Sequence, residues 1–572
     1  MKNNIIKRIG TLFTLVIIAC SAVFIIPSTD THATPSSPMG SWSDYISFDW
    51  KDLDDSRYSG YGDVEAGTTK ENPFLIKTPG ELASLDGTWN NVYMKLAPDN
   101  GVIDLSAHYW DPVHIRGVGN PYDPAEYLPD GGDAWRDEDA LHLDGNGVII
   151  KGLFIDGEES YYDNSLGLFK EIYKAEISNI IFSDSTIDGT FFDRNQMPVS
   201  AGILAGYVRN SKISQISSSN FQVNINSPNA SVYLYSPEYS DLAIGGLIGE
   251  SIYNTITRGI SVTNGQINVD TKIINNLYSE VNILSNYIGG IIGFQNQGTL
   301  HSSYSDVGIN FISRESLADF ITISYVGGLV GATSGSPYFI QAVCILNSYS
   351  RTNITAQSGD MMFTGGLAGM LQDSAVNNYY HGNINATGVD VTTGQLFGIV
   401  GDIYDELGSV SHDIDHRYVD LTSDSSEYKI LGNYYNPTVT NIPPVGITDQ
   451  IPWGAPDEGY TDSPNIPETA IKPFQSAEWL LSTLEPGRQE VIALLSRAGI
   501  AGLNANVLHW CIFPSINDGY PTFGSSCPIP PLPPDTGANI RSIASIVGFT
   551  IVAIGAVMII SKKRNIKDKD KP

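Results

Sequence analysis

A glycine-bracketed pentapeptide recurs along the middle of the chain and limits the folds open to it. Four close copies start at Gly245, Gly289, Gly327 and Gly365, and each reads Gly-Gly, two apolar residues, Gly. Degenerate copies end at positions 170, 206 and 398, so the fifth positions are separated by 36, 43, 44, 38, 38 and 29 residues. Self-similarity at periods of about 20–50 residues is typical of a solenoid. The alternative, a glycine-rich linker, would not keep apolar residues at fixed offsets.

The unequal repeat length favours strands over helices. Helical repeats tolerate little change in length, whereas a β-solenoid can absorb extra residues in loops that leave the stack. A second pattern of apolar or β-branched residues, interrupted by Ser and Asn, starts at Ile177, Leu300, Ile345 and Val376. Such composition is typical of short strands and corners rather than of a long helical stripe.

Aligning this second pattern predicts a register. Equivalent positions of a parallel solenoid stack about 4.8 Å apart. We therefore expect one interior ladder of aliphatic residues and another of aromatic rings. The predicted ladders are Leu300, Ile345 and Val376, and Tyr304, Tyr349 and Tyr380. Residues 221–241, 264–285 and 309–323 are interpreted as insertions that leave the stack as loops or extra strands.

The Gly-Gly-Leu-Val-Gly cores resemble the GLUG motif of bacterial cell-surface proteins, and flanking segments resemble further rungs of that family. These segments are Glu71–Leu85, Tyr93–Leu96, Val102–Leu105, Trp110–Val113 and Leu143–Leu153. The resemblance implies an all-β, right-handed parallel β-helix of the pectin-lyase-like kind with an N-terminal cap. Within that cap, Thr78 and Glu81 have capping-box spacing around a short helix.

The C-terminal part of the body differs from the repeats. Residues 476–502 carry the only convincing helical pattern. The ending from Trp510 to Pro521, with Ile-Asn-Asp-Gly-Tyr-Pro at its close, resembles the closing strand pair of the same family. Cys511 and Cys527 flank that turn with 15 residues between them. In an exported protein a disulfide there would contribute about 3 kcal/mol, and two free thiols are the alternative.

Both ends of the chain carry targeting features. Lys2, Lys7 and Arg8 precede an apolar run, and Ala33 fits the last residue before signal-peptidase cleavage. Cys20 suggests a lipoprotein signal as an alternative, but the apolar run continues beyond it. Near the C-terminus a Pro-rich spacer is followed by an apolar run and a basic tail, which resembles a sortase sorting signal of LPxTG type. The motif is Pro533, Pro534, Asp535, Thr536 and Gly537, with Pro533 where the family has Leu.

These features divide the chain into eight segments. They are a signal peptide (1–33), an irregular segment (34–70), an N-terminal cap and first rungs (71–140), the repeat β-helix (141–401), a C-terminal irregular and capping region (402–527), the spacer and sorting motif (528–537), a transmembrane segment (538–561) and a basic cytoplasmic tail (562–572). We expect an extracellular protein that is anchored to the cell wall or membrane by its C-terminus.

The composition and motifs contain no assembled catalytic, cofactor or metal site. The net charge of −30 argues against nucleic acid, whose phosphates need Lys and Arg. No His-Glu-x-x-His motif occurs, and His412 and His416 lack a third ligand. Ca²⁺ is considered only at the acidic run 130–139, which lacks EF-hand spacing.

The resulting hypothesis is a non-enzymatic adhesin or structural binding stalk. Its partners would be a protein or glycan ligand on a host or neighbouring cell, and sortase or the membrane itself as anchor. The alternative is a polysaccharide lyase or glycosidase displayed at the cell surface, since parallel β-helices host both activities. A glycosidase needs two carboxyl groups across a groove, which the sequence does not identify.

Overall fold

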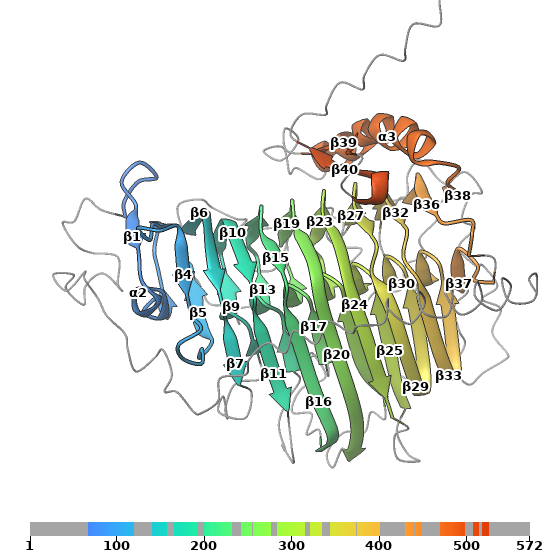
Figure 1. Cartoon of the computed structure of the whole chain (residues 1–572), viewed down its shortest axis with the longest axis horizontal. Helices are drawn as coiled ribbons and strands as arrows, with labels where there is room; N and C mark the ends of the chain where they lie inside the picture. Colours follow the sequence, from blue (N-terminus) through green and yellow to red (C-terminus); the bar gives the residue numbers. More distant parts are fainter. Residues whose placement is uncertain are drawn as a thin grey trace, which may run out of the picture. The chain divides into compact units, whose positions relative to one another are not determined.

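The computed structural model describes most of the chain between residues 67 and 524. The described ranges are 67–118, 140–156, 165–190, 199–231, 242–253, 255–275, 283–314, 321–334, 344–372, 374–400, 430–439, 441–447, 470–497, 507–513 and 517–524. They belong to one compact unit, which ends at Ser525. Strands of successive coils lie side by side in this unit (Figure 1).

Each full coil contributes strands to five columns, and strands of one column pair in parallel with their equivalents in the next coil. Column 1 contains β8 (Ser165–Leu166), β12 (Val199–Ala201), β17 (Leu242–Gly245), β21 (Ile283–Gly289) and β25 (Ile321–Gly327). Column 2 contains β2 (Gly87–Thr88), β5 (Val113–Arg116), β9 (Phe169–Tyr173), β13 (Ala205–Arg209), β18 (Ile248–Ile252), β22 (Ile292–Asn296), β26 (Val330–Ser334), β30 (Ala368–Leu371), β34 (Phe397–Val400) and β37 (Val445–Ile447).

The other columns complete the coil. Column 3 contains β1 (Phe74–Ile76), β3 (Val92–Leu96), β14 (Lys212–Ser214), β19 (Ile256–Arg258), β23 (Thr299–His301), β27 (Cys344–Leu346), β31 (Ser374–Val376) and β35 (Ile430–Leu431). Column 4 contains β4 (Val102–Asp104), β15 (Ser217–Ser219), β28 (Tyr349–Ser350), β32 (Tyr379–Tyr380), β36 (Asn433–Tyr435) and β38 (Ile471–Pro473). Column 5 contains β7 (Phe154–Asp156), β11 (Thr186–Thr190) and β16 (Gln222–Ser231). Longer strands pass through two columns: β6 (Leu141–Lys151), β10 (Ala175–Ser183), β20 (Ser261–Asn275), β24 (Tyr304–Ser313), β29 (Asn353–Gly365) and β33 (Ile384–Gly394).

The pentapeptide forms the corner between columns 1 and 2. Gly246 N–H donates to the carbonyl of Gly289 at 3.3 Å, and Gly290 N–H donates to that of Gly327 at 3.1 Å, so the corners of adjacent coils are hydrogen-bonded. A Cβ at Gly246 would lie 2.3 Å from the carbonyl oxygen of Gly290. Only glycine fits there, which explains why the pair recurs.

The corner between columns 3 and 4 has a different cause. One residue of each coil turns there with positive φ, as in Asn179 (59°), Ser302 (50°), Asn347 (48°) and Asn377 (63°). Asn adopts this left-handed conformation more readily than most residues with a side chain. The Ser and Asn of the second sequence pattern are therefore corner residues.

The two ends of the described chain are built differently. At the N-terminal end, α2 (Pro79–Ala83) begins with the predicted capping box: Thr78 Oγ1 accepts from the N–H of Glu81, and Glu81 accepts from the N–H of Thr78 at 2.9 Å. At the C-terminal end, α3 (Ala477–Arg497) packs its Val491 and Leu495 against Leu346 and Val376 on the outside of column 3. The hairpin of β39 (His509–Ile512) and β40 (Pro521–Gly524) is antiparallel and contains the short helix η6 (Asn517–Gly519).

The described residues confirm an all-β chain of stacked parallel strands with few helices, and the hand of the coil stays a prediction. Part of the predicted register is wrong. Tyr304 and Tyr349 are paired as expected, but Tyr379 rather than Tyr380 continues that column. Likewise Ile345 pairs with Ala375 instead of Val376. The consecutive tyrosines allowed an alignment shifted by one residue, which in a strand exchanges inside and outside.

The residues interpreted as insertions are also placed differently. Most of 222–231, 264–275 and 309–313 are strands within the stack, and they pair in register with the coils before and after them. Their inward residues, such as Val223, Ile267 and Ile309, join the apolar core. These segments form column 5 rather than loops.

Candidate functional site

The outer side of column 5 is a solvent-facing strip of uncharged amide and hydroxyl side chains, which we call the amide face. It lies on β16, β20, β24, β29 and β33, which run side by side as long arrows in Figure 1. Its side chains are half-buried or exposed, whereas their neighbours in the strands are buried in the core. The amide face consists of Gln222, Asn224, Gln266, Asn268, Asn310, Asn353, Thr355, Asn383 and Asn385.

Hydrogen bonds between coils hold these amides in a line. Asn310 Nδ2 donates to Asn268 Oδ1 at 2.8 Å, and Asn268 Nδ2 donates to Asn224 Oδ1 at 2.8 Å. An amide side chain has two N–H donors and an oxygen with two lone pairs, so the ladder occupies about half of that capacity. The remainder is held at fixed orientation and is available to a ligand.

The ladder continues in altered form toward the C-terminal coils. Asn383 Nδ2 donates to Asn353 Oδ1 at 3.1 Å, and Thr355 occupies the position equivalent to Asn310. One ion pair borders the face, where Arg314 Nε donates to Asp270 Oδ1 at 2.8 Å. This arrangement can form many neutral hydrogen bonds.

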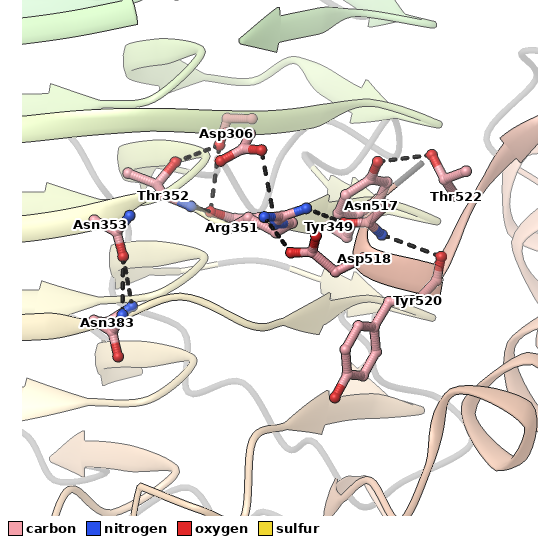
Figure 2. Close-up of polar contacts among 12 residues, drawn as sticks. Asp306, Tyr349, Arg351, Thr352, Asn353, Asn383, Asn517, Asp518, Tyr520 and Thr522 are labelled. Atoms are coloured by element: carbon pink, nitrogen blue, oxygen red, sulfur yellow. Dashed lines mark hydrogen bonds and ion pairs between the residues drawn. The ribbon is translucent and has the colours of Figure 1, made fainter. Parts of the chain in front are cut away.

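A charged cluster lies beside the amide face, where the C-terminal hairpin meets the stack (Figure 2). Arg351 contacts Asp518 at 2.8 Å and Asp306 at 3.7 Å, and its Nη1 donates to Asn517 Oδ1 at 3.2 Å. Burial raises the pKa of Asp306, and Asp518 adds to the rise, whereas Arg351 opposes it. The Arg351 guanidinium thus forms ion pairs with two carboxylates, that of Asp306 in the stack and that of Asp518 in the turn of the hairpin.

The same region contains the tyrosine stack. Rings of Tyr304 and Tyr349 lie 4.8 Å apart and nearly parallel, and Tyr349 and Tyr379 are 4.9 Å apart. Tyr349 is hydrogen-bonded to Thr522 at 2.7 Å, and Asn517 Nδ2 donates to the Tyr379 hydroxyl at 2.7 Å. Tyr304, Tyr349 and Tyr379 therefore lie outside the coil, under the hairpin. The predicted interior position is wrong for Tyr304 and Tyr349, whereas Tyr380 is buried in the core.

A second charged cluster lies on column 2 and is buried. Arg116 Nε donates to Glu171 at 2.8 Å, and Arg209 lies 3.9 Å from the other carboxylate oxygen. Burial alone would raise the pKa of Glu171, but the hydrogen bond with His114 and the charges of Arg116 and Arg209 lower it overall. A carboxylate enclosed by two arginines is a structural ion pair rather than an accessible base.

The predicted site residues are only partly described. Cys511 is disulfide-bonded. Its predicted partner Cys527 lies outside the described residues, so that pairing stays a prediction. The cleavage site at Ala33, the sorting motif 533–537, the acidic run 130–139 and the two histidines 412 and 416 also lie outside them.

The described ranges contain neither a metal-binding cluster nor a membrane-spanning helix. No group of three or more His, Cys, Asp or Glu side chains there could hold a metal ion. Among the same residues, no helix combines the length and apolar character that a membrane span requires.

Sequence reasoning missed the amide face because its segments were interpreted as insertions. The signal was present as strict alternation, for instance Gln222-Val223-Asn224-Ile225-Asn226 and Gln266-Ile267-Asn268-Val269-Asp270. Alternation of polar and apolar residues predicts a strand with one wet face.

Comparisons with known proteins give one similar solved structure and no family. No protein-family model matches it, and no curated protein matches it. A solved structure described as "a putative immunoglobulin A1 protease from Bacteroides ovatus" is similar over 82% of this chain and 98% of that chain, with 14% sequence identity and a TM-score of 0.30.

Proposed function

We propose that this chain is an exported, envelope-anchored bacterial surface protein that acts as an adhesin or binding stalk, and that the amide face binds an uncharged glycan. The observation that carries the proposal is the hydrogen-bonded ladder of Asn224, Asn268 and Asn310 on an exposed side of the stack. The GLUG-like repeats, the right-handed coil and a C-terminal sorting signal belong to the same proposal.

The chemistry of the face favours hydroxyl-rich ligands. Amides donate to and accept from sugar hydroxyls, and the fixed ladder has already lost the side-chain freedom that binding would otherwise cost. Equivalent side chains recur about every 4.8 Å along the stack, so a polymer can be contacted repeatedly. A chain with a net charge of −30 repels anionic polymers and nucleic acids, which leaves neutral glycans as the better match.

The test uses the full chain displayed on its own cells. Replacing Asn224, Asn268 and Asn310 together by Ala should remove most adhesion to a panel of neutral glycans. The matched control is Asn100→Ala, an exposed asparagine in the N-terminal rungs that is outside the amide face. Unchanged adhesion of the triple variant, with normal surface display, would refute the assignment of the face.

The enzymatic alternative has one observation in its favour. Asp306 is a half-buried carboxyl with a raised pKa, as a general acid requires, at the junction between stack and hairpin. A surface lyase or glycosidase would use it on a polysaccharide. Hydrolysis or elimination on a polysaccharide panel that is lost in Asp306→Asn would replace the adhesin proposal. Absence of turnover by the wild-type chain would remove the alternative.

A further inference from the structure

In the coil that contains β36 and β37, the chain between columns 4 and 2 is shorter than in the coils before it. The distance along the chain from column 4 to column 2 can be compared in three successive coils, because both ends are fixed by strand pairing. The bounding residues are Tyr349 and Ala368, then Tyr379 and Phe397, then Tyr434 and Val445, which are 19, 18 and 11 positions apart in sequence. This coil thus takes a shortcut past column 5.

Among the described residues, this shortcut leaves one edge of β33 unpaired. β33 pairs with β29 on one side, and no described residue pairs with the other side of Ile384–Gly388. In that ladder Ile354 N–H donates to the Asn383 carbonyl at 2.8 Å, so the backbone groups of Asn383 and Asn385 are directed to β29. Those of Ile384 and Ala386 consequently face the open edge. In Figure 1 β33 is the last long strand of the stack.

The exposure of the side chains also indicates that this edge of β33 is uncovered. Ile354 and Ala356 of β29 are 1% and 2% exposed, whereas their partners Ile384 and Ala386 in β33 are only half-buried. Val389 is 74% exposed, which is exceptional for a valine in a strand. Natural sheets usually cover or charge such an edge, because free N–H and C=O groups recruit another strand.

We propose that the open edge of β33 is a docking site for an extended, basic segment of another protein, which adds to column 5 as one further strand. Main-chain hydrogen bonds to Ile384 and Ala386 would supply affinity, and alternate apolar side chains of the segment would cover the exposed core. Asp390 is the one charged residue of β33 and is exposed.

The negative charge of this chain favours a basic segment as the strand that docks at the edge of β33. A segment carrying Lys or Arg is attracted to Asp390 and to a chain with a net charge of −30. The same charge repels a second copy of this chain, which disfavours edge-to-edge dimers. This site shares β33 with the amide face but uses the main-chain groups of Ile384 and Ala386 rather than the amide side chains, so the proposal does not depend on the proposed function.

The experiment uses the full chain and the synthetic peptide Lys-Val-Thr-Val-Thr-Val-Lys as probe. Hydrogen exchange should slow at Ile384 and Ala386 on peptide addition, and binding should weaken at high salt. The variant Ala386→Pro removes an edge-directed N–H without removing a bond to β29, and should weaken binding at least tenfold. The control Thr387→Ser changes an exposed side chain on the same strand that is outside the amide face, and should bind like wild type.

Three results would overturn the proposal. They are no binding by the wild-type chain, equal binding by a folded Ala386→Pro variant, and equal binding of a peptide with Asp in place of Lys. Light scattering that shows a dimer abolished by Ala386→Pro would assign the edge to a second copy instead. A second variant, Ala386→Lys, places a charge at the edge and should also block the peptide if Ala386→Pro fails to fold. The triple amide-face variant should bind the peptide normally, so that failure of one site is distinguishable from failure of the other.

Discussion

Tyr349 stacks on Tyr379 with ring centroids 4.9 Å apart and planes inclined by only 5°. Both rings also contact Trp510 of the C-terminal hairpin, at 6.0 and 5.6 Å. The pair is therefore the centre of the contact between hairpin and stack, and its loss should free the hairpin before the coils unfold.

We expect Tyr349→Ala to destabilise this contact by about 3–5 kcal/mol, as for other large-to-small substitutions of buried aromatic residues. Limited proteolysis should then release fragments that are cut near residue 500. Tyr349→Phe, the control, loses only the hydrogen bond to Thr522 and should cost about 1 kcal/mol. Equal resistance of wild type and Tyr349→Ala to protease would contradict this role.

Replacing Ile345 by Asp should unfold much of the stack. Ile345 is fully buried between Leu300 and Ala375, so an unpaired charge there would cost roughly 4 kcal/mol or more. Ile312, which is 40% exposed on the outer side of β24, provides the control. Circular dichroism should show a large fall in Tm for Ile345→Asp and almost none for Ile312→Asp.

Acid should destabilise the chain through His301. This histidine is fully buried, and burial together with the charge of Arg258 lowers its pKa from 6.5 to about 3. Because the folded state binds its proton less readily than the unfolded state, its contribution is complete above pH 6.5 and is lost as pH falls toward the folded pKa. At 1.36 kcal/mol per pKa unit, the loss by pH 4 is on the order of 3 kcal/mol.

Urea unfolding at pH 7, 5 and 4 measures this loss. His301→Gln should flatten the profile over that interval. Ile345→Val, a conservative change at a buried residue that does not titrate, is the control, and it should lower the free energy of unfolding by a similar amount at all three pH values. A wild-type profile that is already flat would show that His301 is not the titrating group.

Reduction should loosen the C-terminal hairpin. Cys511 is disulfide-bonded, and a bond to Cys527 would close a short loop worth about 3 kcal/mol. Non-reducing peptide mapping should identify the pair, and dithiothreitol should lower the Tm of wild type but not of Cys511→Ser. A bridge from Cys511 to any other cysteine would reject the predicted pairing.

Mass spectrometry of the mature protein can determine how the C-terminus is anchored. If sortase acts, Thr536 is the last residue retained and residues 537–572 are absent. An intact basic tail on most molecules would instead indicate a membrane anchor without cleavage. Thr536→Ala separates the two, because only sortase-dependent anchoring should be lost.

Much of the architecture was predictable because it follows from local steric rules. The Gly-Gly pair marks a corner where adjacent backbones touch, and Asn347 marks one where the chain turns with positive φ; both rules operate residue by residue. The capping box at Thr78 is equally local. The open edge of β33 was not predictable, because it depends on which residues of the last coil are paired.

The register of the tyrosines shows the limit of pattern alignment. Tyr379 and Tyr380 are both buried, one under the hairpin and the other in the core. Hydropathy cannot distinguish two buried environments, so the sequence alone leaves a one-residue ambiguity. The amide face was missed for a different reason. The variable repeat length was attributed to loops, whereas the strands of column 5 themselves differ in length.

The hairpin is fixed to the side of the stack, and this determines how the protein would bear tension. Trp510 Nε1 donates to Asn347, Leu508 N–H donates to Ser302, and Asp518 contacts Arg351, so the attachment spans coils from residue 302 onward. A pull applied through the chain beyond residue 524 would load these contacts together in shear. The final coil would not be peeled away alone, because the force enters the stack through several coils at once.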